Sequence, residues 1–226
     1  MHASLGRFCA RLAAGEPVTA LMFGTSITFG SQVDPARDEE AAYPSQWRDA
    51  MLARFPGARL EVLNRGAPGS KIANAHERLE AVLAEKPDLL VVEYGINDCW
   101  EGAEGIDEFE SSLRLLVERL RIAAAAPVIL LTANMLNHRS SPEALELAWF
   151  AEKTAEVQTA GWTAAYMDCV RRIARDEGLP LADGYASWEA ARAAGVDTDG
   201  LLANMANHPN REGHRLLAEA LSALFV

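Results

Sequence analysis

The amino-acid sequence predicts an α/β protein, specifically a three-layer α/β/α sandwich around a central, mostly parallel five-stranded sheet. Short apolar runs without polar alternation recur along the chain, as expected for parallel strands that are buried on both faces. Segments with helical periodicity separate these runs, and such alternation is typical of layered α/β folds with right-handed crossovers. We expect a single domain over residues 1–226, since a chain of this length can bury one large core.

Five segments have the composition of buried strands. Four of them are clear apolar runs and the last is weaker. In chain order they are residues 18–23, 60–63, 89–93, 127–132 and 179–182. A glycine follows each of the first three runs within three residues, which marks where the chain leaves the sheet.

Four segments are predicted to be helical from the spacing of their apolar residues, and they are residues 72–82, 109–120, 143–177 and 211–224. We expect Ser70 to cap the first of them. Ser141 and Pro142 have the residue types of an N-cap and a first-turn proline before the third, which we expect to break near Gly161. The acidic stretch 34–40 is expected to be a solvated loop.

The charge of the chain disfavours several classes of partner. It has 21 basic and 32 acidic residues, a net charge of -11, and its lysines and arginines are not clustered. Binding to a phosphate backbone relies on a basic surface, so we expect no nucleic-acid partner. The same charge disfavours anionic membrane surfaces and polyanionic substrates.

The compartment is predicted from the N-terminus and the cysteines. The first 23 residues lack a basic region followed by a long apolar core, and no later segment reaches about 18 uninterrupted apolar residues. Cys9, Cys99 and Cys169 are odd in number and lack CxxC spacing, which favours reduced thiols over a disulfide framework or a zinc site. We expect a cytoplasmic protein without a membrane span. A secreted mature chain stays an alternative.

Chemistry-bearing residues follow three successive strands and precede the last helix. Ser26 comes after the first predicted strand, Gly66 after the second, and Asn97 after the third, while His208 lies shortly before the final helix. In an open parallel sheet, ligands bind beyond the carboxyl ends of the strands. Each residue alone has an ordinary explanation as a turn, cap or loop residue. Their order predicts a hydroxyl, a backbone N–H, a carboxamide and an imidazole around one site.

These segments resemble the four blocks of the SGNH hydrolase superfamily, also called GDSL-type esterases and lipases. The first block is Gly-Thr-Ser-Ile-Thr at residues 24–28, in which Thr25 stands where the family usually has Asp. The second corresponds to Gly66 and the third to Gly-Ile-Asn-Asp at residues 95–98. The last is the His-Pro that begins residues 208–214. The resemblance covers nearly the whole chain and implies the flavodoxin-like fold of this superfamily.

The resemblance implies a serine esterase that acts on a small-molecule ester, an acetyl ester being one candidate. Ser26 would be the nucleophile and His208 the base that takes its proton, a role that suits a neutral imidazole near pH 7. The backbone N–H groups of Ser26 and Gly66 and the side chain of Asn97 would form the oxyanion hole. The resemblance implies no metal and no organic cofactor.

One position departs from the family pattern. A carboxylate usually lies three residues before the histidine, where this chain has Met205. We therefore expect a Ser-His dyad in which His208 Nδ1–H donates to a backbone carbonyl or to Asn204. Neither Asp197 nor Asp199 is expected to orient the base.

Other readings of the same residues stay open. An acyltransferase or thioesterase could use the same site, and the chain could instead be a non-catalytic module that binds carbohydrate or acyl ligands. Trp100 is expected near the acyl pocket, Asp98 is expected to hold its own turn, and His138 could line the site. His214, in the final helix, is expected to be a packing or capping residue. The sequence does not predict an oligomeric state.

Overall fold

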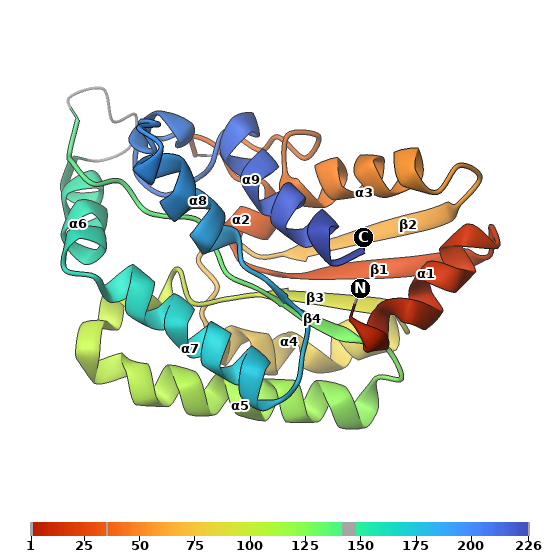
Figure 1. The fold of residues 1–226 in the computed structure, drawn as a ribbon. Helices are drawn as coiled ribbons and strands as arrows, with labels where there is room; N and C mark the ends of the chain where they lie inside the picture. The colour runs from red at the N-terminus through yellow and green to blue at the C-terminus, as the bar shows by residue number, and fades with distance from the viewer. Residues whose placement is uncertain (1, 35, 142–147, 226) are drawn as a thin grey trace.

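The computed structural model describes residues 2–34, 36–141 and 148–225, and Figure 1 shows their arrangement. Five strands form one parallel sheet in the order β2-β1-β3-β4-β5. Their bounds are Pro17–Gly24 for β1, Arg59–Gly66 for β2, Leu89–Glu93 for β3, Val128–Leu131 for β4 and Leu181–Ala182 for β5. The predicted fold class is confirmed. The first two strands are longer than predicted, and the weak fifth is only two residues long.

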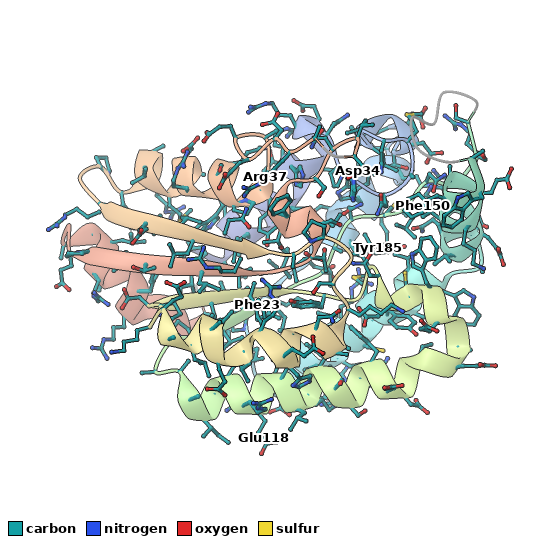
Figure 2. All side chains as sticks on the ribbon, turned by 180° about the vertical axis from the view of Figure 1, so that it is seen from behind. Phe23, Asp34, Arg37, Glu118, Phe150 and Tyr185 are labelled. Atoms are coloured by element: carbon teal, nitrogen blue, oxygen red, sulfur yellow. The ribbon has the colours of Figure 1, made fainter. Side chains whose placement is uncertain are left out.

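Helices cover both faces of the sheet, which gives the three layers. One layer contains α4 (Ile72–Ala84), α5 (Ile106–Ala123) and α7 (Trp162–Asp176), and the opposite layer contains α3 (Tyr43–Arg54), α8 (Gly184–Ala193) and α9 (Arg211–Ser222). Figure 2 shows the layers from the opposite side, with α3 above the sheet and α4 and α5 below it. Phe23 of β1 lies between the sheet and α4, and Glu118 of α5 points away from the sheet. The apolar stripes of these helices therefore face the strands.

The predicted helices are present with small changes at their ends. The buried residues of α4 are Ile72, Ala75, Leu79 and Val82, the set that gave the helical pattern. Its N-cap is Lys71 and not Ser70. The third predicted helical segment is interrupted at Gly161, as predicted. This glycine has the left-handed φ of 83° and separates α6 (Ala148–Thr159) from α7. The expected helix start at Pro142 and the next five residues lie outside the described residues.

Among the described residues, the longer helices outside the four predicted segments are α1 (Gly6–Ala13), α3 and α8. Phe8 of α1 packs against Phe225, and Trp47 of α3 contacts the same ring, with centroid distances of 6.1 and 5.5 Å. Within the described residues, no helix is both long enough and apolar enough to span a membrane.

The order of the strands fixes where a ligand site belongs. The chain moves outward from β1 to β2 in one direction and from β3 to β5 in the other, so the order reverses between β1 and β3. In this doubly wound topology, ligands bind at the carboxyl ends of the two strands that flank the reversal. Gly24, the last residue of β1, pairs with Glu93, the last residue of β3. The segments that follow these two residues contain Ser26 and Asn97.

Candidate active site

Ser26 begins the short helix α2 (Ser26–Phe29) directly after β1. Thr25 is the N-cap of this helix, and its Oγ1 accepts a hydrogen bond from the N–H of Ile27 at 3.2 Å. Because Ser26 is the first residue of the helix, its N–H has no acceptor within the helix. The turn of residues 24–28, called the Ser26 turn below, therefore presents a hydroxyl and a backbone donor together.

A buried carboxylate, that of Glu93, lies beneath the Ser26 turn. Its Oε2 accepts from the N–H of Thr25 at 3.1 Å, from Thr25 Oγ1 at 2.9 Å and from Thr28 Oγ1 at 2.9 Å. Glu93 is fully buried. A Cβ atom on Gly24 would lie 2.1 Å from Thr28 Oγ1 and 2.7 Å from Glu93 Oε2, so only glycine leaves room for this cluster.

Burial raises the pKa of Glu93 from 4.5 to about 7, although the hydrogen bonds from Thr25 and Thr28 oppose this rise. Among the described side chains, none with a positive charge forms an ion pair with it. A carboxylate that is desolvated and lacks a cation is expected to titrate near neutral pH. No sequence motif indicates that Glu93 supports the Ser26 turn. In the sequence, Glu93 is only the last residue of an apolar strand.

Asn97 follows β3 and contacts the turn after β2. Its Nδ2 donates to the carbonyl oxygen of Ser70 at 2.8 Å. The same turn is joined to the end of β1, because the N–H of Ala67 donates to the carbonyl of Gly24 at 3.0 Å. An amide nitrogen carries two hydrogens, so a second one stays available for a ligand. The carboxyl ends of β1, β2 and β3 therefore meet at one place.

Gly66, predicted to be an oxyanion donor, ends β2 and lies against α2. Its N–H donates to Oδ1 of Asn64 at 3.0 Å, so this predicted oxyanion donor is already engaged. A Cβ on Gly66 would lie 2.1 Å from the backbone nitrogen of Phe29 and 2.8 Å from the carbonyl of Thr25. Glycine is needed here because β2 passes close beneath α2.

Gly69 is better placed to offer a backbone donor. The Ser70 N–H donates to the Ala67 carbonyl at 3.2 Å, and Gly69 has a φ of 70°, which with Pro68 before it is typical of a type II turn. An added Cβ on Gly69 would meet nothing within 4 Å. Gly69 is adjacent to Ser70, the residue that Asn97 holds. The Pro-Gly pair in the sequence was the signal that could have identified it.

His208 is held on the loop that follows α2. Its Nδ1 lies 2.7 Å from the backbone carbonyl oxygen of Gln32, and Gln32 Nε2 donates to the carbonyl of Pro209 at 3.1 Å. A carbonyl oxygen only accepts, so Nδ1 carries the proton in this contact and the lone pair of the neutral ring lies on Nε2. The acceptor is one of the two expected from the sequence. Nothing in the sequence identified Gln32 as its source.

A buried carboxamide organises the turn that presents His208. Oδ1 of Asn204 accepts from the backbone N–H groups of Ala206, Asn207 and His208 at 3.0–3.1 Å. Its Nδ2 lies 3.3 Å from His208 Nδ1 and donates to Asn207 Oδ1 at 2.8 Å. Met205, at the position of the family's carboxylate, has the left-handed φ of 56°. The carboxamide thus fixes a strained turn by satisfying three backbone donors.

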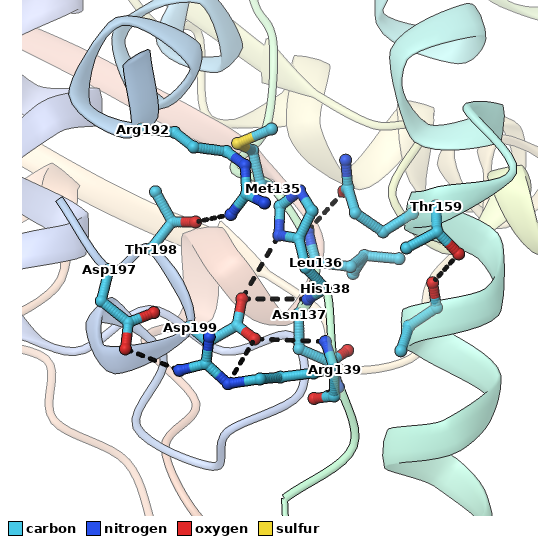
Figure 3. Close-up of polar contacts among 12 residues, drawn as sticks. Met135, Leu136, Asn137, His138, Arg139, Thr159, Arg192, Asp197, Thr198 and Asp199 are labelled. Atoms are coloured by element: carbon cyan, nitrogen blue, oxygen red, sulfur yellow. Dashed lines mark hydrogen bonds and ion pairs between the residues drawn. The ribbon is translucent and has the colours of Figure 1, made fainter. Parts of the chain in front are cut away.

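The two aspartates near this turn have other partners, as Figure 3 shows. Asp199 is buried, and its oxygens accept from the N–H groups of His138 at 2.9 Å and Arg139 at 3.2 Å. His138 Nδ1 lies 3.3 Å from the same carboxylate. Asp197 pairs with Arg139 at 2.7 Å. Asp199 therefore anchors the loop after β4, and His138 belongs to that anchor.

The remaining candidates have structural roles. Asp98 Oδ1 accepts from the N–H of Ile72 at 2.9 Å, so it holds the start of α4, and burial raises its pKa to about 6. Burial raises the pKa of Cys99 to about 12, which leaves it a poor nucleophile. Trp100 stacks on Phe150 with a centroid distance of 5.3 Å. His214 is fully buried, as expected for a packing residue.

The described residues contain no group of three or more His, Cys, Asp or Glu side chains that could hold a metal ion. The acidic loop 34–40 is exposed at each of its described residues, as predicted.

Comparisons with known proteins point to one family. The sequence model of the GDSL-like lipase/acylhydrolase family matches residues 22–216. An acetylxylan esterase of Geobacillus stearothermophilus is 29% identical over 122 residues, which span 47% of this chain and 55% of that protein. The solved structure of Axe2, an acetylxylan esterase from the same organism, has a TM-score of 0.72 at 22% identity and covers 92% of this chain and 94% of its own. LAE5, an α/β hydrolase from the metagenome of Lake Arreo, has a TM-score of 0.71 at 23% identity with the same coverage.

Proposed function

The chain belongs to the GDSL-like lipase/acylhydrolase family, and from this premise we propose that it is a serine esterase that hydrolyses a small acyl ester through a Ser26–His208 acyl-enzyme mechanism. The observation that carries the mechanism is the 2.7 Å contact between His208 Nδ1 and the Gln32 carbonyl. That contact sets the tautomer in which Nε2 can accept a proton. It gives the histidine of a dyad the orientation that a carboxylate gives in a triad.

The first half of the reaction acylates Ser26. Its Oγ forms a bond to the ester carbonyl carbon while its proton passes to His208 Nε2. The Nδ1–H of the resulting imidazolium donates to the Gln32 carbonyl, whose dipole stabilises the positive charge. Collapse of the tetrahedral intermediate breaks the bond to the alcohol oxygen, and His208 returns the proton to the departing alcohol.

The charge on the former carbonyl oxygen needs preorganised donors. We assign the N–H of Ser26, the N–H of Gly69 and the second hydrogen of Asn97 Nδ2 to this role, with Gly69 in place of Gly66. Two facts support the exchange: the N–H of Gly66 is bonded to Asn64, and Gly69 is next to the residue that Asn97 holds. Donors of this kind contribute roughly 2.7–4 kcal/mol each when measured by removal.

The second half releases the acyl group. A water molecule gives a proton to His208 Nε2 and attacks the acyl-enzyme carbon, and the same donors hold the second oxyanion. The intermediate collapses with cleavage of the bond to Ser26 Oγ, which takes the proton back. The products are a carboxylic acid and the free serine, so the cycle closes with no other group consumed.

The relatives suggest which ester to test first. Two of the three proteins named above are acetylxylan esterases, so an O-acetyl group on a sugar is the substrate class that we propose.

A fluorophosphonate probe tests the nucleophile, because it reacts with an activated serine whatever the natural substrate is. We expect the wild-type chain to be labelled and Ser26→Ala to be unlabelled. Ser26→Ala and His208→Ala should each remove most activity on p-nitrophenyl acetate, and the double variant should lose little more, since the two residues act as one unit. Labelling that survives in Ser26→Ala would place the nucleophile elsewhere. An unlabelled wild-type chain would favour a binding module.

The acyl chain and the acceptor are tested separately. A panel of p-nitrophenyl esters of increasing chain length, with Ser26→Ala as the blank, should show the highest kcat/KM for acetyl. Adding an alcohol acceptor then distinguishes hydrolysis from acyl transfer, which would give a transesterified product. A preference for long chains would contradict the acetyl assignment without touching the nucleophile.

A further inference from the structure

The mechanism just proposed leaves one buried titratable group next to the nucleophile unused, the carboxylate of Glu93. It makes three hydrogen bonds through Oε2 to the Ser26 turn, with the Thr25 N–H, Thr25 Oγ1 and Thr28 Oγ1 at 2.9–3.1 Å. Oε1 also lies 3.2 Å from Thr25 Oγ1. The residues on either side of this cluster, Gly24 and Ser26, belong to the same turn. The Glu93 side chain therefore holds the backbone next to Ser26 through hydrogen bonds.

The network around Glu93 suits an ionised acceptor. The Thr25 N–H can only donate. Thr25 Oγ1 accepts from the N–H of Ile27, so its own hydrogen is available to Glu93. Thr28 Oγ1 lies 2.9 Å from both Glu93 Oε2 and the hydroxyl of Tyr43, and either hydroxyl can be the donor in the second contact. When Glu93 is ionised, Thr28 donates to it and Tyr43 donates to Thr28. An ionised carboxylate accepts only, which matches this arrangement, whereas a carboxylic acid must donate from one oxygen.

We propose that Glu93 is a positioning residue which, as an ionised acceptor, holds the Ser26 turn in the geometry from which Ser26 attacks. This inference rests on the serine esterase function proposed above. Protonation of Glu93 would add a hydrogen to a network that suits an ionised acceptor. The turn would then have to reorganise, and attack by Ser26 would slow while substrate binding stayed the same.

The surroundings of Glu93 favour its titration near neutral pH. Burial raises its pKa to about 7. The titratable groups that face it are Tyr43 from α3 and Tyr94, the next residue, and burial raises the pKa of both phenols, which stay neutral. Arg78 of α4 reaches the hydroxyl of Tyr94 at 3.3 Å and does not pair with Glu93. The ring of His214 lies 6.4 Å from that of Tyr43, and burial lowers its pKa to about 3.

Glu93→Gln is the sharpest test, because glutamine keeps the shape and stays neutral at every pH. We would measure the rate of fluorophosphonate labelling from pH 5.5 to 8.5, together with kcat and KM on p-nitrophenyl acetate. At pH 8 we expect the variant to label about tenfold or more slowly, with KM unchanged within about twofold, since small misplacements of a nucleophile cost rate. The ratio of wild-type to variant rate should fall toward one below pH 7. Any other group that acts equally in both proteins cancels in this ratio.

Asp183→Asn is the matched control. Asp183 also accepts from a threonine hydroxyl and a backbone N–H at the end of a strand, but it lies beyond β5 and does not touch the Ser26 turn. We expect its labelling rate and pH profile to match the wild type. A Glu93→Gln variant that labels at the wild-type rate would overturn the inference. So would a loss that does not change with pH, because it would reflect packing and not the charge. An unlabelled wild-type chain would instead overturn the proposed function.

Thr28→Val keeps the test decisive if Glu93→Gln fails to fold. Valine is close in shape to threonine, and the change removes one donor to Glu93 while leaving the carboxylate in place. Loss of that donor favours the protonated form, so we expect the acid side of the pH profile to move to higher pH, with KM unchanged. A Thr28→Val profile with the wild-type midpoint would contradict the coupling between the turn and the charge on Glu93.

Discussion

Two carboxylates at the carboxyl ends of strands accept the same kinds of hydrogen bond, but only one of them is paired with a cation. Glu93 ends β3 and Asp183 follows β5, and each accepts from a threonine hydroxyl and from a backbone N–H at the start of a helix. Arg171 donates to both oxygens of Asp183 at 2.8 and 3.0 Å. Burial acts to raise the pKa of Asp183, but the hydrogen bonds from Arg171, Thr132 and the Ala186 N–H together outweigh it and leave that pKa below its usual value. Glu93 has no such cation.

The difference shows which of the two serves the fold. The pKa of Asp183 is lowered, so its contribution to stability is present above pH 3.8 and is lost as the pH falls through its folded-state value. The pKa of Glu93 is raised from 4.5 to about 7, so its contribution is present below pH 4.5 and is lost as the pH rises through 7. At neutral pH, Asp183 stabilises the protein and Glu93 does not. A buried group that costs stability beside a nucleophile is typical of a functional site.

The largest effect on activity is expected at Asn97, which follows the strand that ends in Glu93. We predict that Asn97→Ala lowers kcat on p-nitrophenyl acetate by about 10²–10³-fold and changes KM little, because the donor meets charge that exists mainly in the transition state. Steady-state kinetics measure both quantities, and thermal unfolding serves as the control for the lost bond to Ser70. An unchanged kcat with a raised KM would assign Asn97 to substrate binding.

The next effect concerns stability and has the opposite sign to the loss of activity. Because Gln cannot ionise, Glu93→Gln should gain stability relative to the wild type as the pH rises from 4 to 8. A change from 4.5 to about 7 corresponds to about 3 kcal/mol in the free energy of unfolding. Urea unfolding at several pH values would measure it. If the difference between the two proteins does not vary with pH, Glu93 does not carry a proton in the fold at pH 5–6.

Asp183→Asn should give the reverse result. We predict a loss of about 2 kcal/mol in the free energy of unfolding at pH 7, because the change removes the charged partner of Arg171, while asparagine can still cap the helix. The loss should shrink as the pH falls below 4, and kcat should stay near the wild-type value. A variant that keeps its stability but loses kcat would erase the contrast between the two carboxylates.

Much of the fold could be predicted because parallel strands leave a strong signal in the sequence. The apolar runs at 18–23 and 89–93 became β1 and β3, and burial on both faces is the reason that they lack alternation. The prediction omitted α3, although Tyr43, Trp47 and Met51 recur at i, i+4 and i+8 and are all buried. That helix was missed because it follows an acidic loop with no strand before it.

The site was harder to predict where it depends on contacts that the backbone makes. The expected segments do contain Ser26, Asn97 and His208 at their ends. These residues could be identified because a reactive side chain occurs in a recognisable sequence motif. The carbonyl of Gln32 has no such sequence motif, because every residue has a backbone carbonyl and only the fold decides which one faces His208. Gly66 and Gly69 are three residues apart. The Pro-Gly pair indicates a turn at Gly69, but only the fold shows that Gly66 lies under α2.

A third carboxylate, Asp197, gives the smallest expected effect and tests whether charge alone near the base matters. It pairs with Arg139 at 2.7 Å, and both side chains are more than half exposed, so solvent screens the pair. We predict that Asp197→Asn leaves kcat within about twofold and the melting temperature within about 2 °C of the wild type. The histidine takes its orientation from Gln32 and Asn204 in our account, so neutralising Asp197 removes nothing that it uses. A loss of about 10³-fold in kcat with the fold intact would show instead that a displaced carboxylate completes a triad with His208. Asp197 would then join Glu93 as a carboxylate that serves the chemistry, and the dyad would be wrong.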